Sequence, residues 1–238
     1  LLLSLHPYFL VMTGNYIAII FILIAFIPLL DSYQKEDSYL YSFRSSILIA
    51  VASLFQVYAI VLIPLWWRGE RTMRGPQLRS FLATLFGVIL VYITLFSVYI
   101  VLDNIYTFLY PINCFITISL PKIPDYSIFE WASFIFILLY FSINMVLSIK
   151  EFARDKVLTL NLMQFIIYLI IILLIVQVIF WETTLFYLTL SVVLISFICS
   201  YFYSKTTSKS NIYLGYIMLF LILLFYLLQY FPETFLIA

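Results

Sequence analysis

The chain has 238 residues, of which 66% are hydrophobic and 10% are charged, and its formal net charge is +1. This balance leaves too little polar surface for a water-soluble globule of that length. The composition therefore excludes a soluble domain and indicates an integral membrane protein.

Seven apolar bands follow one another along the chain, each with about 20 apolar residues, the length at which a helix crosses a hydrocarbon core of about 30 Å. They are continuously apolar and lack the two-residue alternation of barrel strands. The sequence therefore predicts an all-α, polytopic membrane protein with seven transmembrane helices. The predicted spans are 8–30, 45–67, 79–102, 129–149, 157–181, 184–204 and 211–232.

The connection 103–128 is longer than the others and contains a further apolar stretch, residues 105–120. That stretch is short and contains Pro111, so we interpret it as an interfacial or partly buried crossover. The predicted organisation is a two-helix part, residues 1–78, followed by a five-helix bundle, residues 79–238, that includes the crossover. No soluble domain and no internal repeat is evident.

The charged residues fall in the gaps between the bands and alternate in sign from gap to gap. Short loops rich in Lys and Arg stay on the side of synthesis, so this pattern predicts an N-terminus on the inner side. The other face collects most of the acidic residues, including those of the 31–44 connection. The basic face carries Arg68, Arg71, Arg74, Arg79, Lys150, Arg154, Lys156, Lys205 and Lys209.

The interiors of the predicted spans carry only neutral polar groups, such as Gln56, Asn144, Gln164 and Gln177. We expect these amides to form hydrogen bonds between helices, and we expect neither a buried salt bridge nor a bound cofactor among the helices. His6 is the only histidine, and a metal site needs three or four converging ligands. The sequence therefore predicts no catalytic, cofactor-binding or metal-binding residue in this chain.

The end of the second predicted span carries the most specific motif, LIPLWWRGERTMRGPQLRSFLATLF, residues 62–86. It resembles cytochrome c oxidase subunit III, whose second helix ends in Trp-Trp-Arg and whose third helix opens with a Leu-Arg pair, matched here by Leu78 and Arg79. The segment HPYFLV, residues 6–11, is similar to that family's opening motif, with Phe9 in place of its second histidine. The glutamate that the family carries ten positions after the Leu-Arg arginine is Ile89 here.

This resemblance implies a non-catalytic core subunit of the respiratory terminal oxidase, which stabilises the catalytic subunit I and holds phospholipid. Haem and copper are expected in the partner subunits and none in this chain. The implied partners are subunit I, other oxidase subunits, phospholipids and the membrane, with no nucleic acid. The candidate lipid-binding residues are Trp66, Trp67, Arg68, Glu70 and Arg79.

The excess of Phe, Tyr, Ile and Leu is typical of an AT-rich organelle genome, so we expect the mitochondrial inner membrane, with the N-terminus in the matrix. A bacterial plasma membrane is the alternative location. Two other functions stay open: a small permease or transporter subunit, and a membrane-embedded lipid-modifying enzyme that uses Arg68, Glu70 and Arg79 at the headgroup level.

Overall fold

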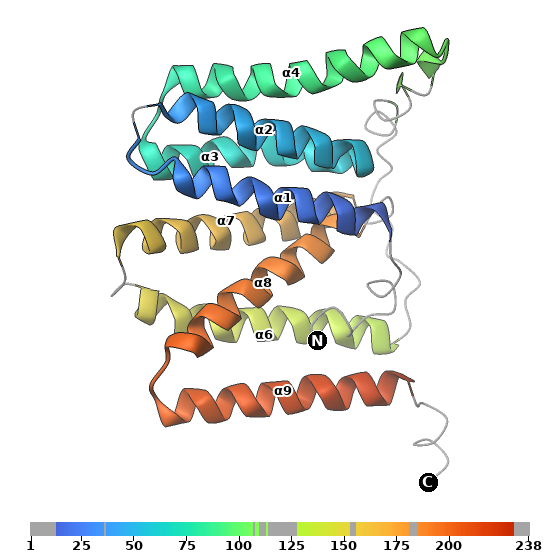
Figure 1. Ribbon diagram of the computed structural model, residues 1–238. Coiled ribbons are helices and arrows are strands. Elements are labelled where there is room, and N and C mark those ends of the chain that lie inside the picture. The colour runs from blue at the N-terminus through green and yellow to red at the C-terminus, as the bar shows by residue number, and fades with distance from the viewer. Residues whose placement is uncertain are drawn as a thin grey trace. The chain divides into compact units, whose positions relative to one another are not determined.

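The computed structural model describes residues 13–35, 37–106, 108–109, 113, 128–152, 156–180 and 185–230, and every regular element within them is a helix (Figure 1). The helices are α1 (Gly14–Asp31), α2 (Ser38–Phe55), the 3₁₀ helix η3 (Val57–Val61), α3 (Leu62–Arg74), α4 (Leu78–Val101), α6 (Ile128–Phe152), α7 (Val157–Ile179), α8 (Phe186–Lys205) and α9 (Lys209–Tyr230).

An all-helical fold is confirmed for this described part of the chain, and its apolar helices support a membrane protein. Five helices there are long and apolar enough to cross a membrane, namely α1, α2, α4, α7 and α8. Helices α6 and α9 contain shorter apolar stretches, residues 135–149 and 209–224.

The helices form two compact units. The N-terminal unit contains α1, α2, η3, α3 and α4, and the C-terminal unit contains α6, α7, α8 and α9. This differs from the two-plus-five grouping expected from the sequence, because α4 packs along α2 within the first unit instead of joining the later helices.

Helix α2 is the centre of the N-terminal unit and lies between α1 and α4 (Figure 1). Its buried side chains are small, mostly serine and alanine, which allows neighbouring helices to approach closely. One close approach is at Gly87 of α4, where an added Cβ would clash with the Oγ of Ser46. Further along, the hydroxyls of Ser53 and Tyr92 are hydrogen-bonded at 2.7 Å.

The predicted second span, residues 45–67, is wrong as a single helix. The chain ends α2 at Phe55 and turns at Gln56, whose backbone is extended with φ −142° and ψ 104°. Pro64 then occupies the first turn of α3, where its missing N–H costs no hydrogen bond. Helix α3 returns beside α2, so the two halves of that apolar band pack against each other.

The C-terminal unit is built around α8, its most buried helix, which crosses α6 and α7 obliquely (Figure 1). The Oε1 atom of Gln177 in α7 accepts a hydrogen bond of 2.9 Å from the backbone N–H of Leu188. This confirms for Gln177 the expected hydrogen bond between helices, and it satisfies a donor in the first turn of α8.

Two predicted features lie outside the described residues, namely the 6–11 motif and most of the crossover. Of the crossover, Phe108 packs its ring against Phe96 and Tyr99 of α4, with centroids 5.1 and 6.2 Å away.

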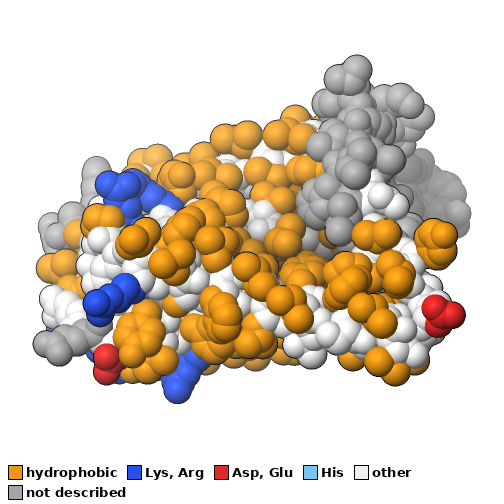
Figure 2. Space-filling view, turned by 90° about the horizontal axis from the view of Figure 1, so that it is seen from above, with side chains coloured by type: hydrophobic (Ala, Val, Ile, Leu, Met, Phe, Trp, Pro, Cys, Tyr) orange, Lys and Arg blue, Asp and Glu red, His pale blue; other side chains and the backbone are white. Residues whose placement is uncertain are grey.

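Hydrophobic side chains cover most of the face shown in Figure 2, and the Lys and Arg side chains gather toward one end of it. Helix α4 contributes large exposed apolar residues such as Phe86 and Ile93. A surface of this kind is stable in contact with lipid or with another apolar protein surface.

Candidate functional site

A tight loop places the end of α3 against the start of α4. Gly75 adopts φ +83°, a backbone conformation that favours glycine. Its N–H donates to the carbonyl of Arg71 at 2.9 Å, which ends the helix, and Pro76 follows. The loop thereby fixes the side chains of Arg74, Gln77 and Ser80 near one another.

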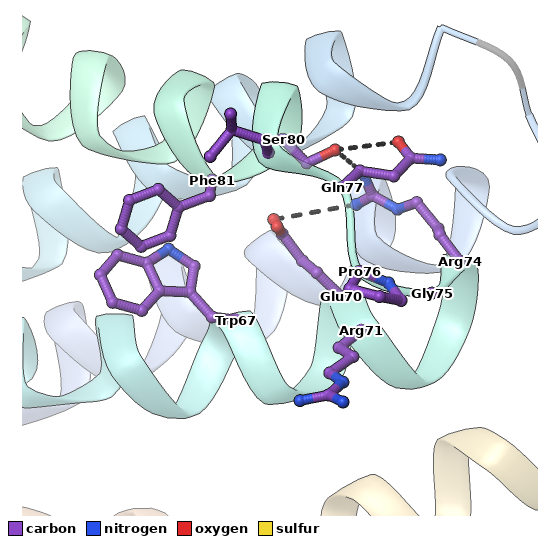
Figure 3. Close-up of a pocket in the computed structure, with 10 residues that line it drawn as sticks. Trp67, Glu70, Arg71, Arg74, Gly75, Pro76, Gln77, Ser80 and Phe81 are labelled. Carbon is purple, nitrogen blue, oxygen red and sulfur yellow. Dashed lines mark hydrogen bonds and ion pairs between the residues drawn. The ribbon is translucent and has the colours of Figure 1, made fainter.

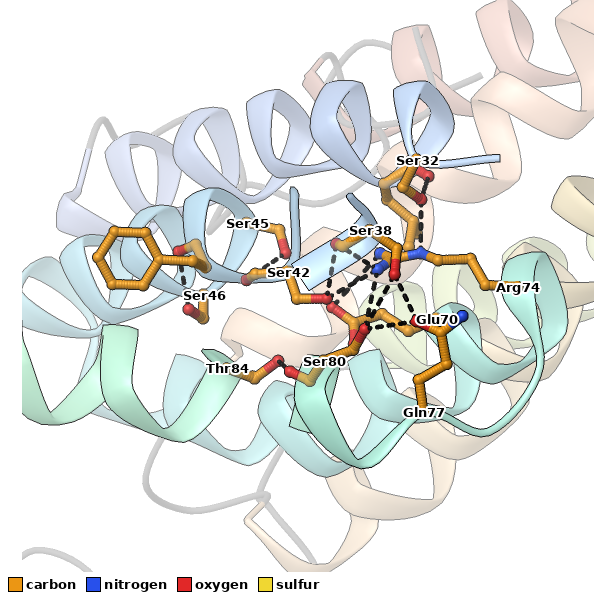
Figure 4. A network of polar contacts seen from close by, with 12 residues as sticks. Ser32, Ser38, Ser42, Ser45, Ser46, Glu70, Arg74, Gln77, Ser80 and Thr84 are labelled. Atoms are coloured by element: carbon orange, nitrogen blue, oxygen red, sulfur yellow. Dashed lines mark hydrogen bonds and ion pairs between the residues drawn. The ribbon is translucent and has the colours of Figure 1, made fainter. Parts of the chain in front are cut away.

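Arg74 is the centre of a polar cluster that joins the helices of the N-terminal unit (Figure 4). Its side chain is 2% exposed. Its Nε donates to the Oγ of Ser32 at the end of α1, at 2.8 Å. Its Nη1 donates to Ser38 O at 2.6 Å and to Ser42 Oγ at 2.8 Å, both at the start of α2. One guanidinium on α3 therefore ties α1 to α2.

Further hydrogen bonds extend the cluster to α4. The hydroxyls of Ser38 and Ser80 both donate to the side-chain oxygen of Gln77, which lies just before α4. Thr84 donates its hydroxyl to the carbonyl of Ser80 at 3.0 Å. The α2 and α4 helices are thus joined through neutral side chains next to the arginine.

Glu70 is the acidic member of the cluster, and its side chain is 6% exposed. Burial raises the pKa of Glu70 to about 7, although the charge of Arg74 and the hydroxyls of Ser42 and Thr84 act in the opposite direction. Burial likewise lowers the pKa of Arg74, and the carboxylate of Glu70 opposes that shift. Removal from water therefore disfavours the charged form of both partners.

The ion pair between Glu70 and Arg74 is wider than a hydrogen bond, with 3.8 Å between Oε1 and Nη2. Both partners belong to α3 and are buried within the N-terminal unit, so the expectation that no buried salt bridge occurs among the helices is wrong. The reason is that α3 turns back into the unit and carries both residues inward, one helical turn apart.

A cavity of about 310 Å³ lies beside this pair, lined by residues of α3, the loop and the start of α4 (Figure 3). The ring of Trp67 packs on Phe81 with centroids 4.3 Å apart and forms one wall. Three buried polar atoms of lining residues have no hydrogen-bond partner among the described residues: Trp67 Nε1, Glu70 Oε1 and Arg74 Nη2. The residues that carry these two donors and this acceptor all line the cavity.

The five predicted lipid-binding residues occupy different environments. Trp67 and Glu70 line the cavity, whereas Arg68 and Arg79 are exposed. The ring of Trp66 is fully buried and packs edge-on against Phe26 at 4.9 Å, so it has no surface to offer to lipid. The ion pair of Glu70 is with Arg74, not with the exposed arginines that the lipid-modifying alternative would use.

Sequence reasoning did not single out the buried Arg74 or the serines that surround it. A signal for the serines was available, because Ser38, Ser42, Ser45 and Ser53 recur at helical spacing on one face of α2. No comparable signal marks Arg74. Arg71 lies on the same short helix and is exposed, so the residue type alone does not tell which of the two arginines is buried.

The polar cluster also changes the expected distribution of charge. Arg74 contacts Ser32 and Ser38, which flank the acidic connection between α1 and α2. This connection and the arginines of α3 therefore lie at the same end of the N-terminal unit, not on opposite faces as the sequence suggested.

Comparison of the chain with models of known protein families, with curated proteins and with solved structures finds no match. Among the described residues, no group of three or more His, Cys, Asp or Glu side chains could hold a metal ion.

Replacing Arg74 with methionine should lower the free energy of unfolding by about 3–5 kcal/mol, because it leaves the buried Glu70 without its counter-charge. The exposed Arg71→Met variant is the matched control and should change stability by less than about 1 kcal/mol. Denaturation of the purified proteins in detergent measures both, and equal losses in the two variants would contradict a structural role for Arg74.

The raised pKa of Glu70 also predicts a pH dependence. Between its ordinary value of 4.5 and about 7, the folded state binds more protons than the unfolded state, so stability falls as pH rises through this window. Glu70→Gln cannot titrate, and the stability of wild type relative to this variant should decrease from pH 4.5 to pH 7. Denaturation at several pH values measures the difference, and parallel profiles would argue against a buried carboxyl.

Proposed function

We propose that this chain is a non-catalytic membrane subunit that holds a phospholipid headgroup at the polar end of its N-terminal unit. One observation carries the proposal: Trp67 Nε1, Glu70 Oε1 and Arg74 Nη2 are buried without hydrogen-bond partners among the described residues, and all three residues line one cavity. Each unsatisfied buried polar atom costs about 1–3 kcal/mol of stability, and more when it is charged. A ligand that forms the missing hydrogen bonds recovers this free energy when it binds.

The chemistry of these atoms fits a zwitterionic headgroup. A phosphate accepts hydrogen bonds from the guanidinium of Arg74 and the indole N–H of Trp67, and an arginine donor strengthens such a bond by its charge. The ammonium group of such a headgroup would donate to Glu70 Oε1, the carboxylate oxygen that has no hydrogen-bond partner among the described residues. The side chain of Arg71 extends away from the ion pair at the edge of the same cavity, where it adds positive charge (Figure 3).

The apolar surface of the N-terminal unit supports a lipid-facing position. A shallow groove of about 670 Å³ between α2 and α4 is lined almost entirely by apolar side chains, among them Leu40, Phe43, Leu82 and Phe86. Such a groove accommodates acyl chains without leaving polar groups unsatisfied.

The assembly that we propose for this subunit is the respiratory terminal oxidase, in which it would be subunit III beside the catalytic subunit I. The Trp66-Trp67-Arg68 motif with the following Leu78-Arg79 pair supports this, and haem and copper would belong to the partner subunits. The motif lies within α3, not at the end of a continuous second span, and α4 packs with α1–α3. The proposal therefore rests on the motif and not on the grouping of helices.

The proposed location is the mitochondrial inner membrane, with the bacterial plasma membrane as the alternative. By the positive-inside rule, the arginine end of the N-terminal unit would face the matrix. Gly14 lies beside Phe55, at the end of α1 remote from Arg74 and Ser32. This topology would therefore place the start of α1 on the side of the membrane opposite the matrix. The prediction of seven continuous spans would instead place it in the matrix.

A small permease is the second candidate, and one observation favours it. The chain is broken at Gln56 and carries a buried ionisable pair beside a cavity, which are features of substrate sites in transporters.

Affinity purification of the tagged chain from its native membrane should bring down a complex that shows the visible absorption spectrum of haem and contains copper. The reason is that the proposed partners carry all the redox centres. An unrelated polytopic protein with the same tag is the control. Recovery of the chain alone, with substrate uptake by the purified chain in liposomes, would replace the oxidase proposal with the permease.

Trp67→Phe should reduce the phospholipid that co-purifies with the chain, because it keeps a ring against Phe81 but removes the indole donor. Trp131→Phe in α6 is the matched control and should retain the wild-type amount. Lipid phosphate per chain, measured together with headgroup composition by mass spectrometry, is the readout. Equal lipid content in both variants would exclude a headgroup contact at Trp67.

A further inference from the structure

The C-terminal unit contains a second cavity, of about 600 Å³, between α6, α8 and α9. Its volume lies within the range of about 300–1,000 Å³ that is usual for small-ligand sites. None of its lining residues is charged, and they include three tyrosines, Tyr140, Tyr203 and Tyr216. The lining therefore suits a neutral molecule with an apolar body.

The position of Tyr203 depends on the glycine opposite it. A Cβ added to Gly215 of α9 would lie 2.7 Å from Cε1 of the Tyr203 ring, so only a glycine lets the ring lie this close to the α9 backbone. The hydroxyl of Tyr203 is buried and has no hydrogen-bond partner among the described residues. A buried tyrosine normally satisfies its hydroxyl, so the free donor here calls for an acceptor.

The neighbouring polar groups do not supply that acceptor. The hydroxyl of Tyr140 and the thiol of Cys199 are hydrogen-bonded to each other. The hydroxyl of Ser196 donates to the carbonyl of Val192 in its own helix, at 2.8 Å. Of the side chains that line this cavity, Tyr203 is therefore the one whose hydroxyl is buried without a partner among the described residues.

We propose that this cavity binds a neutral, lipid-soluble molecule with a flat ring and a carbonyl acceptor, that is, a quinone-type molecule. The hydroxyl of Tyr203 donates to the carbonyl, and the tyrosine rings pack against the flat ring in offset or edge-on geometry. A phospholipid headgroup fits less well, because the lining offers no charge to a phosphate. This binding site goes beyond the proposed headgroup site and lies in the other unit.

The route into the cavity is from the side of the helices. Tyr216 and Leu219 line it from α9, and both are exposed on the surface of the described chain. Their position on an apolar helix places the opening among lipid-facing side chains such as Phe220 and Leu223. A molecule dissolved in the hydrocarbon core therefore enters without crossing water.

The test uses the purified full chain in phosphatidylcholine nanodiscs and radiolabelled decylubiquinone as the probe. We expect saturable binding above the partition into empty nanodiscs. Tyr203→Phe removes only an unpartnered hydroxyl and should weaken binding about fivefold, the effect of one hydrogen bond. Tyr213→Phe, an exposed tyrosine on α9 outside the cavity, is the matched control and should bind as wild type.

Leu219→Trp places a larger side chain at the mouth and should abolish saturable binding, while thermal denaturation checks that the variant is folded. If that variant does not fold, the Tyr203→Phe comparison decides alone. Decylbenzene, which has the same tail and no carbonyl, should not displace the probe. Equal binding by Tyr203→Phe and wild type, displacement by decylbenzene, or uptake no greater than in empty nanodiscs would each overturn the proposal. Because the headgroup site is in the other unit, loss of quinone binding leaves the lipid result of Trp67→Phe unaffected.

Discussion

The buried guanidinium of Arg74 is the interaction on which the arrangement of the N-terminal unit depends. It donates to groups at the end of α1 and at the start of α2, and it lies one turn from its counter-charge on α3. Burying an arginine is costly unless its donors are satisfied and its charge is balanced. Here the serines of α2 meet most of the first requirement and Glu70 meets the second, so the return of α3 beside α2 and the polar cluster stabilise each other.

The small side chains of α2 make this arrangement possible. Hydrophobic attraction does not drive helices together within lipid, so association depends on close packing and on hydrogen bonds. The serines of α2 contribute to both, because their hydroxyls bond locally or across to α4 while their size allows contact at Gly87. The same helix therefore packs against α1 and α4 and provides two of the acceptors around Arg74, Ser38 O and Ser42 Oγ.

The two units contain cavities of opposite character. The cavity of the N-terminal unit lies beside a charged pair and offers unsatisfied donors and an acceptor, which suits a polar headgroup. The cavity of the C-terminal unit has no charged lining residue, and the hydroxyl of Tyr203 is buried there without a partner among the described residues, which suits a neutral ring with a carbonyl. Both proposals follow from the same physical requirement, namely that a buried polar atom needs a partner.

The class of this protein and much of its helix content follow from its amino-acid sequence, because continuous apolar bands can satisfy their backbone groups in lipid only as helices. The predicted spans 79–102 and 157–181 agree closely with α4 and α7. The sequence also indicated that the segment around Trp67 and Glu70 is the chemically distinctive part of the chain.

Three features became evident only from the folded chain. The band 45–67 forms two segments side by side, and Trp66 lies in the core. Glu70 pairs with Arg74 instead of Arg68 or Arg79. The physical reason is that hydropathy reports the environment of a residue but not the direction of the chain. A single extended residue at Gln56 reverses the path without any change in apolar character, and that reversal selects which charges meet.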